Sequence, residues 1–258
     1  MTTSTIFKTT IFTSTIRTLF CCSLLCLSLV GCSDNTGSDD SNSDNKSSNN
    51  TNTSSNSQSA SSDTSNNETY SEGVHYSVLK DPITHNSDNI VVTEFFWYGC
   101  SHCANFEPLL HQWDKTKPAG VSLEQSPAMW NDTMKLHAKA FFVAQTLENA
   151  EKLHAQLFSV IMGLHGQKDL EKHKEALAGA FQPYGLDKDA FYAQLNGFKI
   201  NGQLSQAAKK MQQAQLKGTP LLVVNGKYAI NNGSIKRASE LLTIANFLIA
   251  KEQASIKK

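Results

Sequence analysis

The sequence lacks the long apolar run and the basic clusters that would assign it to several common classes of protein. Its 258 residues balance 23 Lys and Arg against 23 Asp and Glu, and residues 70–258 carry a surplus of only three positive charges. With no basic run, this charge pattern gives no reason to expect nucleic-acid binding. The longest apolar run, Leu19–Val30, has twelve residues, whereas a membrane-spanning helix needs about 20. A transmembrane helix is therefore not predicted.

Cysteine is scarce once the N-terminal region is set aside. Four of the six cysteines lie within the first 32 residues, and only Cys100 and Cys103 follow. No second C-x-x-C and no closely spaced histidine pair completes a four-ligand zinc site, and one close pair builds no disulfide scaffold. A structural bridge between such near neighbours would restrict the unfolded chain very little. The pair is therefore predicted to be chemically active.

The first 31 residues have the pattern of a secretory signal. Residues 1–18 carry two basic residues and no acidic one, and Leu19–Val30 has the length of a signal h-region. The end of this run, Leu29-Val30-Gly31-Cys32, resembles the bacterial lipoprotein cleavage box, in which the cysteine becomes the lipidated first residue. The sequence thus predicts a lipoprotein signal peptide over residues 1–31, export, and a lipid anchor on Cys32.

Residues 32–72 are predicted to combine this lipidated cysteine with a disordered tether. Ser33–Thr69 consists almost entirely of Ser, Asn, Asp and Thr, and cannot bury enough apolar surface to fold. A flexible coil of these 37 residues spans roughly 30–35 Å, which is enough to hold a domain clear of a membrane. A spacer that only aids solubility is the alternative interpretation.

From residue 73 the pattern alternates between strands and helices. It predicts strands at 74–79, 90–97, 121–125, 221–224 and 227–230, and helices at 100–115, 204–216 and 235–250. Apolar residues at three- and four-residue spacing make the segment 131–197 helical, and Asn225-Gly226 is a strong hairpin signal. The predicted architecture is an α/β domain over 73–130 and 198–258, interrupted by an all-helical insertion over 131–197.

The motif Cys100-Ser101-His102-Cys103 lies where an apolar strand gives way to a helix. A C-x-x-C at such a junction is typical of a dithiol/disulfide redox centre. Unpaired N–H groups and the positive dipole end of the first helical turn stabilise a thiolate, and a protonated His102 would add a second positive charge. We therefore predict that Cys100 is the nucleophile and that Cys103 is the resolving thiol.

Several residues near the motif allow two interpretations. Glu94 is either a buried acid that exchanges protons with Cys103 or a strand-end carboxylate that reaches solvent, and its aromatic neighbours favour burial and a raised pKa. Glu107 either supports the site or is an ordinary helix-surface charge. Trp97 and Tyr98 either flank a peptide groove or belong to the core. The seven histidines outside the motif lack ligand spacing and are predicted to be solvated or core residues.

Residues 74–256 resemble the thioredoxin-fold, DsbA-like thiol oxidoreductases of the bacterial envelope. The resemblance rests on Glu94, Cys100-Ser101-His102-Cys103 with Phe106-Glu107, the helical block 131–197, and Lys217-Gly218-Thr219-Pro220-Leu221 leading to Val224-Asn225-Gly226-Lys227-Tyr228. It implies a thioredoxin fold with an inserted all-helical domain. It also implies that the Thr219-Pro220 bond is cis and lies against the reactive cysteine, where the preceding backbone pairs with a bound peptide. Gln125 stands about where a lysine often partners the buried acid, which predicts a higher pKa for Glu94.

The same resemblance implies a thiol:disulfide oxidoreductase without a cofactor or a metal ion. Its most direct form is an oxidase that donates the Cys100–Cys103 disulfide to reduced exported polypeptides through a mixed disulfide. A quinone-linked membrane partner would reoxidise it, and the protein would be a monomer anchored in the periplasm. A disulfide reductase or isomerase and a redox-silent peptide-binding envelope lipoprotein are the alternatives, because Ser101 replaces the proline of well-known oxidases and Thr219 is typical of other thioredoxin-like proteins.

Overall fold

The structure is a computed structural model that describes residues 70–231, 233 and 235–256. The predicted signal, the lipidation site Cys32 and residues 33–69 lie outside the described residues. Where the chain is described, no helix is both long and apolar enough to cross a lipid bilayer. Tyr70 falls in the predicted tether, but its ring is buried and packs edge-to-face on Phe247. The folded part therefore includes Tyr70.

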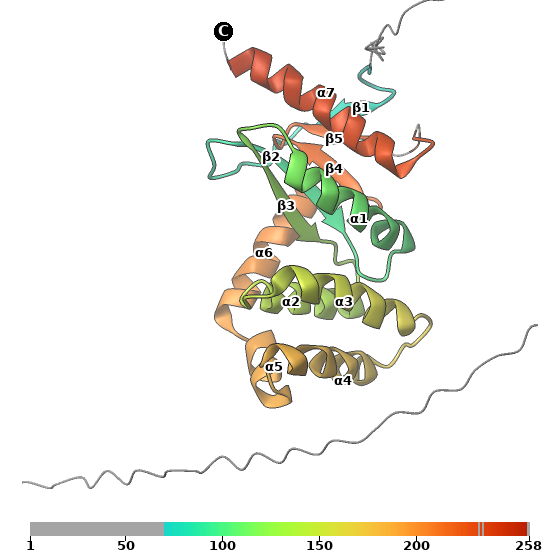
Figure 1. Cartoon of the computed structure of the whole chain (residues 1–258), viewed down its shortest axis with the longest axis vertical. Coiled ribbons are helices and arrows are strands. Elements are labelled where there is room, and N and C mark those ends of the chain that lie inside the picture. The colour runs from blue at the N-terminus through green and yellow to red at the C-terminus, as the bar shows by residue number, and fades with distance from the viewer. Residues whose placement is uncertain (1–69, 232, 234, 257–258) are drawn as a thin grey trace, which may run out of the picture. The chain divides into compact units, whose positions relative to one another are not determined.

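A five-stranded mixed sheet forms the centre of the α/β part (Figure 1). Its strands, in the order in which they lie side by side, are β1 (Tyr76–Val78), β5 (Tyr228–Ile230), β4 (Leu221–Val224), β2 (Ile90–Phe96) and β3 (Val121–Pro127). β2 runs parallel to β3 and antiparallel to β4, and the register places Glu94 opposite Gln125. All seven residues of β2 are buried, as its nearly continuous apolar sequence predicts.

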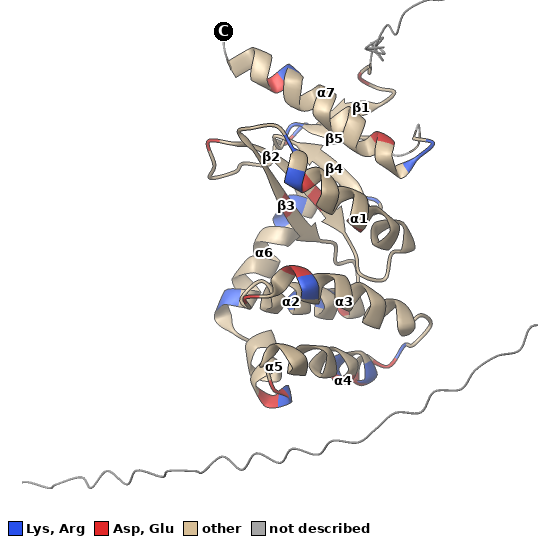
Figure 2. Cartoon of the chain, viewed as in Figure 1, with Lys and Arg blue, Asp and Glu red and all other residues tan. Residues whose placement is uncertain are grey.

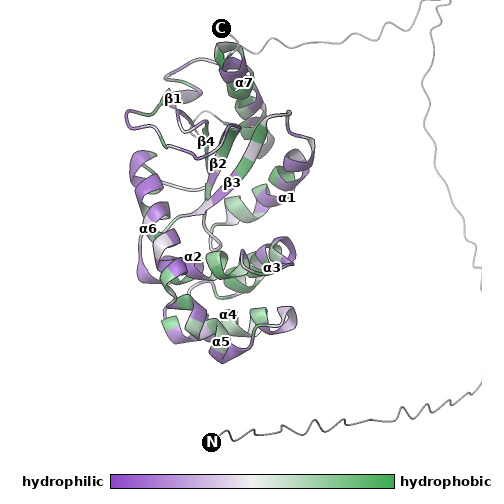
Figure 3. Ribbon diagram, turned by 90° about the vertical axis from the view of Figure 1, so that its left-hand side faces the viewer, coloured by the Kyte–Doolittle hydropathy of each residue, from purple (hydrophilic) through white to green (hydrophobic). Residues whose placement is uncertain are grey.

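Helices cover both faces of this sheet. The helices are α1 (Ser101–Thr116), α2 (Asp132–Ala144), α3 (Ala150–Gly163), α4 (Leu170–Phe181), a 3-10 turn at Gln182–Tyr184, α5 (Lys188–Leu195), α6 (Phe198–Gln213) and α7 (Ala238–Ile256). α1 and α7 pack on the face that presents Val92 and Val224, and α6 packs on the face that presents Phe95 and Val223. Figure 3 shows α1 and α6 on opposite sides of the strands.

The helices α2 to α5 form a block with its own apolar core, which joins the end of β2. Phe96 packs there against Phe141 and Phe158. Figure 2 shows that charged residues lie mainly on helices and loops, whereas the strands carry few; within β2 the only charged residue is Glu94. The predicted fold class, an α/β domain interrupted by an all-helical block, is confirmed.

Two predicted helices have different bounds in the structure. α6 begins at Phe198 rather than at 204, because Gly202 and the almost fully exposed Phe198 weaken the apolar pattern of its first turns, where Ile200 is the only buried residue before Leu204. α7 spans 238–256 rather than 235–250. The longer α6 continues directly from the helical block back to the sheet.

The β4–β5 hairpin turns at Asn225 and Gly226, as predicted, and both residues have a positive φ, 51° and 64°. A Cβ on Gly226 would lie 1.9 Å from the carbonyl oxygen of Ile83. Gly226→Ala is therefore expected to destabilise the protein by about 2–3 kcal/mol, measured by urea unfolding. Gly202→Ala is the matched control, since its Cβ would meet open space within a helix, and it should stabilise the protein by up to about 1 kcal/mol. A similar small effect at both positions would contradict the expectation.

Candidate active site

The two cysteines lie at the start of α1, directly after the end of β2. Cys100 is the N-cap residue of α1, with extended backbone geometry, and its side chain is partly exposed. Cys103 lies within the first turn and is fully buried. Both are free thiols, so the structure shows the dithiol state. Only Cys100 therefore presents its sulfur to an incoming polypeptide.

The surroundings of Cys100 favour its thiolate. A hydrogen bond from the Cys103 thiol lowers the pKa of Cys100 to about 5, against an opposing effect of burial. The Thr219 side chain and the backbone N–H groups of Cys103 and His102 donate further hydrogen bonds that lower the same pKa. The neighbouring thiol is thus the largest stabilising influence, ahead of the free N–H groups of the helix start.

His102 contributes through its backbone rather than through its ring. The imidazole is exposed to solvent, and the interaction that lowers the pKa of Cys100 comes from the backbone N–H of His102. The sequence-based expectation assigned this help to a protonated imidazole instead. A residue at this position can therefore stabilise the thiolate without carrying a charge.

The loop before β4 lies against the reactive cysteine. The Thr219-Pro220 peptide bond is cis, as the family resemblance implied. The Cys100 thiol donates to the carbonyl oxygen of Thr219, with 3.3 Å between sulfur and oxygen. Since a carbonyl accepts only from the protonated thiol, this contact and the Thr219 side chain act in opposite directions on the same sulfur. The loop places backbone polar groups beside Cys100, where an extended peptide could bind them.

Glu94 is fully buried at the end of β2, which excludes the alternative of a strand-end carboxylate in solvent. Burial and the nearby Glu107 raise the pKa of Glu94 to about 8, although a hydrogen bond from Gln125 opposes this shift. The pKa of Cys103 is also raised, because its thiol donates a hydrogen bond to Cys100, because it is buried, and because Glu94 is close. Both groups are therefore protonated at neutral pH in the dithiol state.

A hydrogen-bond network connects Glu94 to the helical block. The Gln125 amide nitrogen lies 2.9 Å from Glu94 Oε2 and 3.1 Å from Glu107 Oε2. His154 Nε2 lies 3.2 Å from Glu107 Oε1, and the Tyr98 hydroxyl lies 2.7 Å from His154 Nδ1. An Nε2–H tautomer lets His154 donate to the carboxylate and accept from Tyr98. Glu107 is thus part of a mostly buried network, and not an ordinary surface charge.

A second chain of hydrogen bonds runs from Trp97 into the helical block. The Trp97 indole N–H donates to His137 Nδ1 at 3.1 Å, and His137 Nε2 lies 3.1 Å from His173 Nδ1. His173 Nε2 reaches the carbonyl oxygen of Gln167 at 2.9 Å. The sequence gives no sign of either histidine network, since His137, His154 and His173 come from different helices and share no motif spacing. Across the described residues, no group of three or more His, Cys, Asp or Glu side chains is arranged to hold a metal ion.

Comparisons with known proteins agree with this site. The profile of a DSBA-like thioredoxin domain matches residues 110–242, just over half of the chain. The thiol:disulfide interchange protein DsbA of Pseudomonas aeruginosa is 34% identical over 190 residues, which cover 73% of this chain and 89% of that protein. The protein of the same name from Azotobacter vinelandii is 33% identical over 168 residues, which cover 64% of this chain and 76% of that protein.

Solved structures give the same result. The crystal structure of Pseudomonas aeruginosa DsbA superposes with a TM-score of 0.66 at 33% identity and covers 73% of this chain and 97% of that one. The structure of the oxidoreductase DsbA from Xylella fastidiosa superposes with a TM-score of 0.63 at 26% identity and covers 70% of this chain and 96% of that one. The similarity thus extends over nearly the whole length of these relatives.

Proposed function

The chain belongs to the DsbA family of thiol:disulfide oxidoreductases, and from this premise we propose that it oxidises cysteine pairs in exported polypeptides through Cys100 and Cys103. Its general activity is that of a disulfide-forming oxidoreductase. The observation that carries the proposal is the position of the Cys100 sulfur. It lies at a helix start, accepts a hydrogen bond from the Cys103 thiol and faces the cis Thr219-Pro220 loop.

The reaction starts from the oxidised enzyme, in which Cys100 and Cys103 form a disulfide. A substrate thiolate attacks the sulfur of Cys100, the bond between the two cysteines breaks, and Cys103 leaves as a thiolate that takes up a proton. The substrate's second thiolate then attacks the substrate sulfur of the mixed disulfide, and Cys100 leaves as a thiolate. Two electrons pass from the substrate to the enzyme, and the substrate departs with a disulfide.

Glu94 is proposed to supply the proton that Cys103 needs. Its carboxyl is buried beside the pair, and burial, Glu107 and Cys100 raise its pKa to about 8, so it holds a proton at neutral pH. The proton returns to Glu94 when the dithiol is reoxidised. Gln125 holds this acid in place, since its amide nitrogen donates hydrogen bonds to the carboxyl groups of both Glu94 and Glu107.

The low pKa of Cys100 makes the disulfide oxidising. The leaving Cys100 thiolate is stable at neutral pH, since its pKa of about 5 lies well below ambient pH. Two pH units of such stabilisation correspond to about 60 mV of reduction potential. This favours transfer of the disulfide to the substrate and disfavours the reductase alternative.

The N-terminal region suggests where the protein works. We propose that residues 1–31 are a lipoprotein signal, that Cys32 carries a lipid, and that the polar segment up to 69 tethers a monomeric enzyme in the periplasm. A quinone-linked membrane protein is the proposed reoxidant. Release of the protein from membranes when Cys32→Ala is introduced would test the anchor, and labelled lipid incorporation into the wild-type chain would report it directly.

Titration of the thiolate tests the proposed function. The absorbance of the reduced protein is expected to rise with a midpoint near pH 5, the value of about 5 that the Cys100 surroundings give. Thr219→Val removes the donor hydroxyl and should raise the midpoint, while Cys100→Ser should abolish this transition. A wild-type midpoint between pH 8 and 9, the range of an ordinary thiol, would remove the physical basis of the oxidase.

A further inference from the structure

A pocket of about 330 Å³ reaches the turn that precedes the reactive cysteine and takes no part in the mechanism above. Gly99, the residue before Cys100, lines it together with Trp97, and its other walls come from the start of α2, the end of α3 and the start of α4. We call it the Trp97 pocket. Its volume lies within the range of about 300–1,000 Å³ in which proteins bind small ligands.

The indole ring of Trp97 is held rigidly against the active-site turn. A Cβ on Gly99 would lie 2.4 Å from the ring, so only glycine leaves room for the indole at this place. The ring lies nearly coplanar with His137, with an interplanar angle of 15°, and donates its N–H to that residue. A fixed aromatic ring thus lies three residues before Cys100, on the wall of the pocket.

The pocket has no acidic side chain, lysine or arginine in its lining. Of its three histidines, His165 is exposed to solvent, whereas a directed chain of hydrogen bonds holds His137 neutral and connects it to His173. Trp97 donates to His137, His137 to His173, and His173 to the Gln167 carbonyl, so every ring nitrogen in the chain is used. Burial and the neighbouring His173 lower the pKa of His137 to about 3, which agrees with this neutral state.

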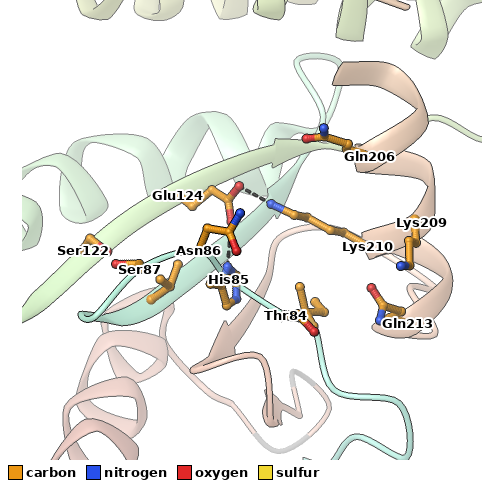
Figure 4. A pocket seen from close by; sticks show the side chains of 12 residues that line it. Thr84, His85, Asn86, Ser87, Ser122, Glu124, Gln206, Lys209, Lys210 and Gln213 are labelled. Atoms are coloured by element: carbon orange, nitrogen blue, oxygen red, sulfur yellow. Dashed lines mark hydrogen bonds and ion pairs between the residues drawn. The ribbon is translucent and has the colours of Figure 1, made fainter. Parts of the chain in front are cut away.

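Another pocket of the described structure shows the contrast. Figure 4 shows the cleft between the segment 84–87, β3 and α6, where Glu124 pairs with Lys210 and with His85 and where Lys209 also faces the opening. That cleft suits polar or charged groups. The Trp97 pocket is lined by Gly99, the residue before Cys100, and offers Ile161, Met162 and Leu164 instead. Of these, methionine adapts readily to different shapes.

We propose that the Trp97 pocket is a substrate subsite that accepts an apolar or aromatic side chain flanking the cysteine that attacks Cys100. The inference rests on the proposed function, because the occupant belongs to the polypeptide being oxidised. It makes Trp97 a specificity-determining residue. Three features indicate this occupant: Gly99 of the active-site turn lines the pocket, the lining has no Asp, Glu, Lys or Arg, and Trp97 forms an aromatic wall.

The test compares two reduced dithiol peptides that differ only in the two residues flanking the attacking cysteine. Both flanking residues are Phe in one peptide and Gln in the other. Both flanking residues are neutral, so they leave the charge around the thiol unchanged. The oxidised full-length enzyme is expected to be reduced about tenfold faster by the Phe peptide. Stopped-flow measurement of the loss of the enzyme's disulfide gives the ratio of the two rates.

Thr133→Asp places a carboxylate in the pocket wall and is expected to bring this ratio close to one. Thr133 lies in the first turn of α2, where an acidic residue favours the helix, so this variant should fold. Ser239→Asp adds the same charge to the exposed first turn of α7 and should preserve the wild-type ratio. Equal wild-type rates for the two peptides, or an unchanged ratio in Thr133→Asp, would overturn the subsite.

Failure of the proposed function would look different. If neither the peptides nor dithiothreitol reduced the oxidised protein, the oxidoreductase assignment would fail, whatever the pocket binds. Binding affinities of the same peptides, with serine in place of cysteine, would then test the subsite independently of any redox activity. Tighter binding of the Phe peptide would support the subsite, and equal affinities would refute it.

Discussion

Cys103→Ser is expected to accumulate a covalent complex with a substrate peptide disulfide, whereas Cys100→Ser is expected to lose disulfide exchange by at least about a thousandfold. The reason is access. Cys103 is fully buried, while Cys100 is partly exposed at the helix start and has its pKa lowered to about 5 by its hydrogen bonds with Cys103 and Thr219. Without Cys103, the mixed disulfide on Cys100 has no internal thiol to resolve it.

The measurement is a non-reducing gel after mixing each variant with the peptide disulfide, followed by mass spectrometry of the trapped species. Ser101→Ala is a control within the same motif, since it keeps both sulfurs and should show wild-type turnover without trapping. Equal trapping by the two cysteine variants would show that the nucleophile has been assigned wrongly.

The sequence contained enough information to predict most of the fold that positions this site. The apolar run of β2, the C-x-x-C motif after it and the Asn225-Gly226 turn are local signals, and each depends on residues that are neighbours in the chain. The cis Thr219-Pro220 bond came from the family resemblance alone, because cis and trans proline have the same local sequence.

The network around the cysteines was not predictable from the sequence, because it depends on register and on helix packing. The contact between Glu94 and Gln125 exists because parallel pairing sets these residues opposite each other, and a slip of one residue would separate them. His154 reaches Glu107 from a helix of the separate block. Such contacts are set by tertiary structure, and no spacing in the chain indicates them.

The pKa of Cys100 likewise has one cause that the sequence indicates and another that only the structure reveals. The sequence predicts a stabilised thiolate at a helix start, and the structure shows that lowered pKa. The largest cause, however, is the Cys103 thiol, which donates a hydrogen bond to the thiolate from the first turn of the same helix. Cys103 therefore has two functions: it is the leaving group when the substrate attacks Cys100, and its thiol then stabilises the Cys100 thiolate that leaves the mixed disulfide.

Glu94→Gln is expected to stabilise the protein by about 2–4 kcal/mol at pH 8 and to slow disulfide exchange by about a hundredfold. In the folded protein, burial and Glu107 raise the pKa of Glu94 to about 8 from 4.5. Because the folded value lies above the unfolded one, ionisation favours unfolding, and stability falls as the pH rises from about 4.5 to 8. The amide removes this loss, so urea unfolding should show a gain at pH 8 and none near pH 4.

Glu124→Gln, on the neighbouring strand β3, is expected to have the opposite effect on stability at pH 8. Although burial opposes the shift, hydrogen bonds from His85 and Lys210 lower the pKa of Glu124 to about 2, so its carboxylate stabilises the fold above pH 4.5 and loses this effect as the pH falls towards 2. Its amide should therefore lower stability at pH 8 and leave exchange unchanged. We propose that the destabilising buried acid is retained beside the redox pair because Cys103 needs a proton. Wild-type turnover in Glu94→Gln would contradict this proposal.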